Sequence, residues 1–165
     1  MKPVAPAVSE LPPPLDEARL RKVIWLIAGA FFMENLDGTI ITTALPTMAR
    51  SFGRTAIELN IGVSAYLMAL GIFIPASGWV ADRFGTRRVF SLAIALFTLA
   101  SALCGATPTL GTFVAARILQ GMGGAMMVPV GRLVVLKNTP KPKLMAAMSM
   151  LIWPALIAPV LGPPL

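Results

Sequence analysis

Two acidic side chains stand within a long apolar stretch near the start of the chain. Glu34 and Asp37 are three positions apart, so a helix places them on one face. A carboxylate at the centre of a bilayer costs about 3 kcal/mol on insertion scales, and such residues usually line a pathway for ions or substrate. A helix that began only at Ile40 would leave both acids in water, but residues 40–49 fall short of the roughly 20 needed to cross a bilayer. We therefore predict both acids within a membrane-spanning helix.

One arginine lies inside a later apolar run, where it can face these acids. Burial favours the neutral form of Glu34 and Asp37, whereas Arg117 opposite them would favour the carboxylate. Two such states of one site would let a proton and a cationic substrate compete. We expect Asp37 to be the coupling carboxylate, Glu34 an accessory acid or cation contact, and Arg117 the charge that changes partners. The alternative is a static buried pair that only fixes helix packing.

The composition excludes several classes of protein and site. Of the 165 residues, 56% are hydrophobic and 13% are charged, whereas a soluble domain has about 25% charged residues. Together with a mean hydropathy of +0.79, this predicts an all-α integral membrane protein. Cys104 is the only cysteine and the chain has no histidine, so we expect no disulfide within the chain and no zinc or iron site. No serine, cysteine or lysine has the partners of a catalytic nucleophile, and we expect neither a cofactor nor an enzyme.

Hydrophobic runs divide the chain into a tail and five predicted spans. Residues 1–21 include five prolines in the first 15 positions and are predicted to form a solvated cytoplasmic tail. Pro46 is expected to close the first span. The last run reaches Leu165 without a flanking charge, so we expect a chain that is cut off after four complete helices and most of a fifth. The predicted spans within 22–165 are about 22–46, 57–81, 89–106, 112–136 and 144–165.

The net charge of +7 is better explained by membrane orientation than by a nucleic-acid partner. The basic residues lie in short segments between apolar runs. Only Arg50 and Arg54 lie in the connections of one side, whereas the tail, the connection around 82–88 and the connection around 137–143 carry nearly all the others. The positive-inside rule then predicts a cytoplasmic N-terminus.

The junction of the second and third spans holds the most specific motif, GWVADRFGTRR at 78–88. We expect Gly78 to permit close helix contact, Gly85 to permit a turn, and Asp82 to pair with arginines whose contacts break and reform between states. The segment resembles the signature loop of the major facilitator superfamily, although Thr86 stands where many members have another base. The loop residues that carry the resemblance are Gly78, Asp82, Arg83, Gly85, Arg87 and Arg88.

Three further segments resemble motifs of the drug:proton antiporters with about fourteen helices. Residues 36–46 resemble the first-helix motif. Residues 116–125, with Arg117, Gln120 and Gly121, resemble the fourth-helix motif, whose arginine takes part in proton handling by the same resemblance. Residues 158–165 resemble the beginning of the fifth-helix antiporter motif and lack the pair of glycines that would follow. Its matching residues are Pro159, Gly162 and Pro163.

The resemblance covers about residues 22–165 and implies a fold of two six-helix bundles around a central cavity. It implies proton-coupled export of drugs or other small molecules, cationic or amphipathic, across the bacterial inner membrane, with lipid and protons as partners. The remainder of the transporter is then expected to be missing, and the 165 residues alone are not expected to transport. Two alternatives are a non-transporting membrane fragment that associates with other helices, and a small homodimeric exporter. The fifth apolar run argues against the second.

Overall fold

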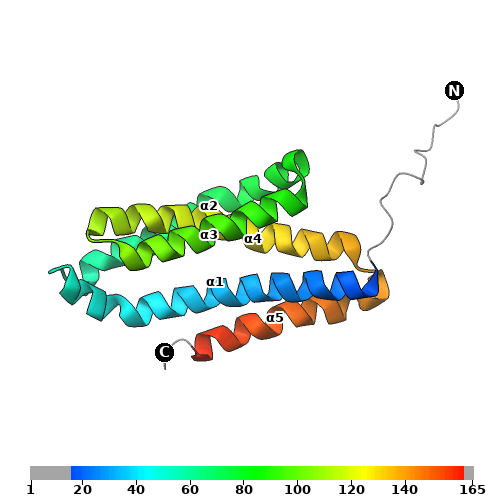
Figure 1. Ribbon diagram of the computed structural model, residues 1–165, viewed down its shortest axis with the longest axis horizontal. Coiled ribbons are helices and arrows are strands. Elements are labelled where there is room, and N and C mark those ends of the chain that lie inside the picture. Colours follow the sequence, from blue (N-terminus) through cyan, green and yellow to red (C-terminus); the bar gives the residue numbers. More distant parts are fainter. Residues whose placement is uncertain (1–15, 162–165) are drawn as a thin grey trace, which may run out of the picture.

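The computed structural model describes residues 16–161, which form a bundle of long helices (Figure 1). Each of the five long helices in this range is long and apolar enough to cross a membrane, which confirms the all-α membrane fold. The tail up to residue 15, Gly162 and Pro163 lie outside the described residues. The helices are α1 (Glu17–Ser51), α2 (Ala56–Phe84), α3 (Thr86–Ala106), α4 (Leu110–Asn138) and α5 (Leu144–Leu161), and the 3₁₀ turn η2 (Lys141–Lys143) precedes α5.

The first four helices extend beyond the predicted spans. Helix α1 begins at Glu17 and continues past Pro46 to Ser51, although the sequence predicts a helix end at that proline. Hydropathy identifies only the part of a helix that crosses the hydrocarbon. It does not detect polar helical turns that continue from that part into water. Proline is also tolerated within membrane helices, because neighbouring helices and hydroxyl side chains can satisfy the freed backbone groups.

The helices pack as two groups. Helix α4 packs along both α2 and α3, and α1 packs along α5, whereas contacts between the pair and the trio are less extensive. Figure 1 shows α5 beneath α1, and α2, α3 and α4 on the opposite side of α1. Glycines let α4 approach α2 and α3 closely: a methyl group at Gly121 would lie 2.7 Å from the Tyr66 carbonyl oxygen, and one at Gly123 would lie 2.9 Å from the Phe97 nitrogen. Gly121 and Gly123 are thus small residues at helix contacts, as is common in membrane helices.

A single residue joins α2 to α3. Gly85 has φ 86°, which glycine adopts without the strain a side chain would bring. The polar loop predicted around it is otherwise helical, because Asp82 lies in the last turn of α2 and Arg87 in the first turn of α3. The expected close helix contact at Gly78 is not found in the described part of the chain, where a methyl group at Gly78 would meet no atom within 4 Å. Gly78 lies on an exposed face of α2.

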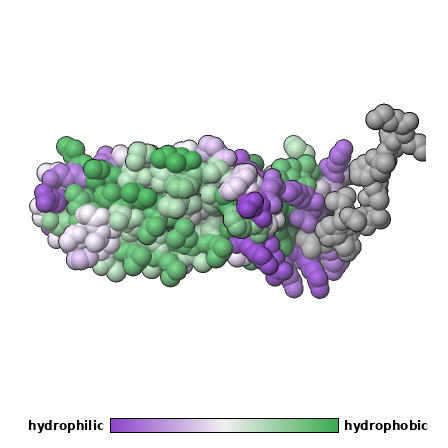
Figure 2. Space-filling model, turned by 90° about the horizontal axis from the view of Figure 1, so that it is seen from above, coloured by the Kyte–Doolittle hydropathy of each residue, from purple (hydrophilic) through white to green (hydrophobic). Residues whose placement is uncertain are grey.

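The surface has an apolar middle and polar ends. Figure 2 shows hydrophobic residues along most of the bundle and a dense hydrophilic cluster at the end from which α1 starts. Large apolar side chains are exposed on this surface, including Trp79 at 65% and Leu92 at 69%. Such a surface suits a lipid environment, since soluble monomers rarely expose large contiguous apolar patches.

Candidate functional site

Helices α1, α3 and α4 bring three polar side chains together in the interior. Asp37 Oδ2 accepts a hydrogen bond from Arg117 Nη1 at 2.8 Å, and Asp37 Oδ1 accepts one from Ser101 Oγ at 3.2 Å. The Arg117 side chain is 1% exposed and that of Asp37 is 12% exposed. The structure therefore places the predicted coupling carboxylate against the predicted arginine. A pair shielded in this way is far less screened by solvent than a surface ion pair.

Arg117 has further partners on α2 and α4. Its Nη1 also donates to Gln120 Oε1 at 2.6 Å, and Cys104 Sγ donates to the same oxygen at 3.6 Å. Its guanidinium carbon lies 4.4 Å from the centroid of the Tyr66 ring, a cation–π geometry. Its Nε has no hydrogen-bond partner within residues 16–161. The charge is thus held by one carboxylate, one amide oxygen and one aromatic face.

Glu34 lies beside the hydroxyl end of Tyr66 and in a different environment from Asp37. A methyl group at Gly124 would lie 3.2 Å from Glu34 Oε1 and 3.3 Å from the Tyr66 hydroxyl, so acid and phenol meet beside α4. Glu34 Oε2 is buried without a hydrogen-bond partner among the described residues. The same side chain lines a cleft of about 540 Å³ between α1, α2 and α4. One helix turn therefore carries one fully paired acid and one acid with free acceptor capacity.

The motif at the α2–α3 junction is separate from this site. Asp82 Oδ1 lies 3.5 Å from Lys137 Nζ at the end of α4, and not beside an arginine as predicted from the sequence. Arg83 instead lies over the Trp79 ring, 5.8 Å from its centroid. The ends of α2 and α4 lie side by side, whereas Arg87 and Arg88 are exposed at the start of α3. Pro159, from the fifth-helix motif, is exposed within α5.

The sequence analysis did not identify Tyr66, Ser101 and Cys104 as site residues. Tyr66 is the only tyrosine of the chain and stands within an apolar run. A buried phenol usually finds a polar partner, so its position was a usable signal. Serine and cysteine occur in many membrane helices as small packing residues, and nothing in their spacing distinguished Ser101 or Cys104.

Comparisons with known proteins agree with this architecture. Residues 27–165 match the family described as Major Facilitator Superfamily. The chain is 48% identical over 158 residues to the "Putative multidrug resistance protein MdtD" of Salmonella typhimurium, covering 96% of this chain and 33% of the relative. It is 49% identical over 146 residues to the protein of the same name from Cronobacter sakazakii, covering 88% and 31%. The chain thus spans about a third of the length of the curated relatives it matches. It belongs to the major facilitator superfamily.

Proposed function

We propose that these helices form part of a proton-coupled exporter of drugs or other small molecules in the bacterial inner membrane, with a cytoplasmic N-terminus. Family membership and the names of the similar multidrug resistance proteins support a transporter. The observation that carries the coupling proposal is the unequal pairing of two acids one turn apart. Asp37 is engaged by Arg117 and Ser101, whereas Glu34 Oε2 has no partner within the described range.

The coupling we propose is an exchange of partners by Arg117. A proton on Asp37 removes the charge that holds Arg117 Nη1 at 2.8 Å. The permanently charged guanidinium then turns toward the remaining acid, Glu34, across the Tyr66 ring that already lies against it. A cation bound to Glu34 would be displaced by this movement. Proton binding and cation binding thereby exclude each other, which is the thermodynamic requirement for antiport.

The cleft at Glu34 supports an amphipathic substrate. Leu70, Ile74 and Val128 supply apolar walls, and Glu34 and Arg132 supply one acid and one base. Pockets for small molecules commonly combine apolar walls with a few polar groups that fix orientation. We propose that the cationic group of the substrate binds Glu34 and its apolar part lies along α2 and α4.

Transport by the complete protein in everted vesicles with an imposed pH gradient tests this function. Glu34→Gln is expected to lower export of a cationic dye at least about tenfold, because the amide removes a full charge from the binding contact. Glu58→Gln is the matched control, since Glu58 is an exposed capping-box acid and glutamine also serves in that motif. Equal export by the wild type and Glu34→Gln would contradict the proposed substrate contact.

The orientation is tested with single cysteines in a Cys104→Ser background. Thr109 is exposed at the start of α4 and Lys141 is exposed at the opposite end of that helix, in η2. With the N-terminus inside, a membrane-impermeant thiol reagent added to intact cells should label Thr109→Cys and leave Lys141→Cys unlabelled. The reverse labelling pattern would invert the topology.

We expect Asp82→Asn and Lys137→Gln to slow transport by a similar factor with little effect on stability. The pair is mostly exposed, and exposed pairs contribute at most about 1 kcal/mol. Its loss would instead shift the balance between conformations in which the ends of α2 and α4 are together or apart. The measurement is the rate of labelling of Leu70→Cys in the cleft, with each variant and with both together.

Arg54→Gln provides the matched control for that experiment. It breaks another exposed pair, Arg54 to Glu58 at 3.3 Å, at the opposite end of the bundle. We expect no change in cleft labelling from this variant. Identical labelling rates in Asp82→Asn, Arg54→Gln and the wild type would show that the junction motif acts only in topology.

A further inference from the structure

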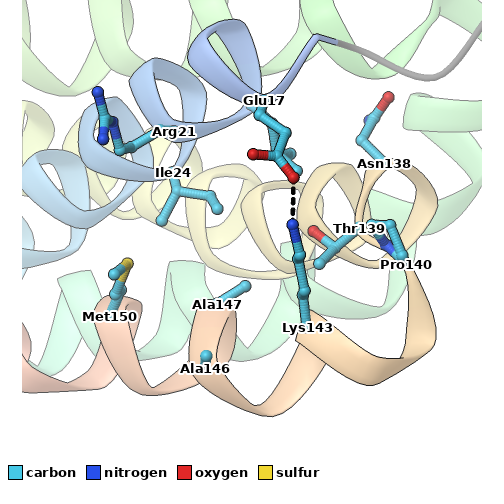
Figure 3. A pocket seen from close by; sticks show the side chains of 11 residues that line it. Glu17, Arg21, Ile24, Asn138, Thr139, Pro140, Lys143, Ala146, Ala147 and Met150 are labelled. Atoms are coloured by element: carbon cyan, nitrogen blue, oxygen red, sulfur yellow. Dashed lines mark hydrogen bonds and ion pairs between the residues drawn. The ribbon is translucent and has the colours of Figure 1, made fainter.

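A second pocket lies at the polar end of the bundle, where α1 starts, α4 ends and α5 begins. It has a volume of about 250 Å³ and is unconnected with the acids of α1 described above. Figure 3 shows its two sides: Ile24, Ala147 and Met150 form an apolar wall, and Lys143 and Thr139 stand at the other side. Arg21 also lines it, one helical turn after Glu17. The pocket therefore joins an apolar wall to a basic one.

Thr139 is the least expected member of this lining. The residue is only 9% exposed, and its Oγ1 is buried without a hydrogen-bond partner in the described part of the chain. In the view of Figure 3 the hydroxyl points toward the Lys143 ammonium group. A buried hydroxyl without a hydrogen-bond partner is unfavourable and uncommon in proteins, so it suggests that a bound molecule supplies the partner. This hydroxyl can donate to an acceptor oxygen that enters the pocket.

The charges around Thr139 favour an anion. Lys143 pairs with Glu17, but both side chains are mostly exposed, at 61% and 81%, so another acceptor can compete for the ammonium. Arg21 has no acidic partner among residues 16–161. Figure 3 shows the Arg21 guanidinium directed away from Lys143 and Thr139. Arg21 is exposed, so its long side chain can turn toward a phosphate group that Lys143 and the Thr139 hydroxyl contact.

The position of the pocket favours a lipid as the source of a phosphate group. Figure 2 shows that the hydrophilic end directly adjoins the apolar surface of the bundle. Basic pockets between membrane helices at this level bind acidic lipid headgroups. A free phosphate ion would bind the basic side chains but would not contact the apolar wall that Ile24 and Met150 form. A phospholipid would contact both, through its phosphate and its acyl chain.

We propose that this pocket binds an acidic phospholipid of the surrounding leaflet. Its phosphate contacts Arg21, Lys143 and the Thr139 hydroxyl, and the start of one acyl chain lies along Ile24, Ala147 and Met150. The lipid thus connects the beginnings of α1 and α5, and its binding does not depend on the proposed transport function.

Lipid binding to the complete purified protein in a neutral detergent provides the test. Native mass spectrometry and thermal unfolding are measured with phosphatidylglycerol, phosphatidylcholine or inorganic phosphate. We expect phosphatidylglycerol to raise Tm more than the other two, and Arg21→Gln/Lys143→Gln to weaken its binding about tenfold, in line with the contribution of basic residues at membrane surfaces. Arg87→Gln/Arg88→Gln removes two exposed charges from the α2–α3 junction, at the start of α3, and should change the affinity less than about twofold.

Thr139→Val separates a lipid contact from a structural role. Valine has nearly the same shape and suits the extended backbone at this position, φ −106° and ψ 127°. We expect a higher Tm without lipid, because a buried unpartnered hydroxyl is removed, together with weaker phosphatidylglycerol binding. Unchanged phosphatidylglycerol affinity in Thr139→Val would overturn the proposal. Equal stabilisation by phosphatidylcholine, or by inorganic phosphate alone, would also overturn it.

Discussion

Asp37→Asn is expected to abolish proton-coupled export by the complete protein while leaving the protein in the membrane. The amide has nearly the same shape and can still accept from Arg117 and contact Ser101, but it does not titrate. It also leaves the Arg117 charge without its ion-pair partner, and breaking a buried pair costs about 3–5 kcal/mol. Export in everted vesicles and unfolding in detergent should therefore both change. Asp16→Asn is the control, since Asp16 is an exposed acid whose side chain makes no cap hydrogen bond.

A charge-neutral double variant decides between coupling and simple packing. Asp37→Asn/Arg117→Gln removes both charges, so it should recover much of the stability lost in Asp37→Asn. Transport should remain absent, because neither the titrating group nor the mobile charge is present. If export returned together with stability, the pair would be a static packing element, and our assignment of Asp37 and Arg117 to proton coupling would be wrong.

Gly121→Ala should be the most damaging single methyl addition to the α2–α4 contact. The new methyl would lie 2.7 Å from the Tyr66 carbonyl oxygen and 2.8 Å from the Ala69 Cβ, and neither of these atoms can rotate away. Overpacking of this kind costs about 1–3 kcal/mol, more than the roughly 1 kcal/mol that alanine gains over glycine in a helix. Movement of α4 away from α2 would also disturb the stacking of Tyr66 on Arg117.

Gly71→Ala is the matched control for this variant. Gly71 lies within α2, and a methyl group there would meet no atom within 4 Å in the described structure. We expect unchanged or slightly higher Tm for Gly71→Ala, and a lower Tm and weaker transport for Gly121→Ala. Equal Tm values for the two variants would contradict the close helix contact.

The buried charges and the apolar runs were the parts of the structure that the sequence could predict. Asp37 and Arg117 are 80 positions apart, yet each is too costly in an apolar span without a partner, so their pairing follows from burial energy. The partner of Asp82 could not be predicted in this way. An exposed acid has many possible cations near it, and the sideways packing of α2 on α4 selects Lys137.

The glycines also show that sequence motifs do not predict which residues contact a neighbouring helix. Gly78 and Gly121 both stand in motifs and both suggest close helix contact, but only Gly121 faces a neighbouring backbone. The face that a helix turns to its neighbours depends on the packing of the whole bundle. Similarly, the position of Tyr66 between Arg117 and Glu34 depends on contacts among three helices that no local pattern records.

Asp37 lies at the boundary between the α1–α5 pair and the α2–α3–α4 trio, and its hydrogen bonds connect the two groups. Among residues 16–161, the side-chain hydrogen bonds between the two groups are those of Asp37 with Ser101 and Arg117. Glu34 of α1 also meets the Tyr66 hydroxyl of α2 across this boundary. Packed helices of this kind can slide past one another by small steps. We therefore propose that Asp37 fastens the two groups of helices to each other, and that its protonation would remove the charge that holds Arg117 and let the groups move apart.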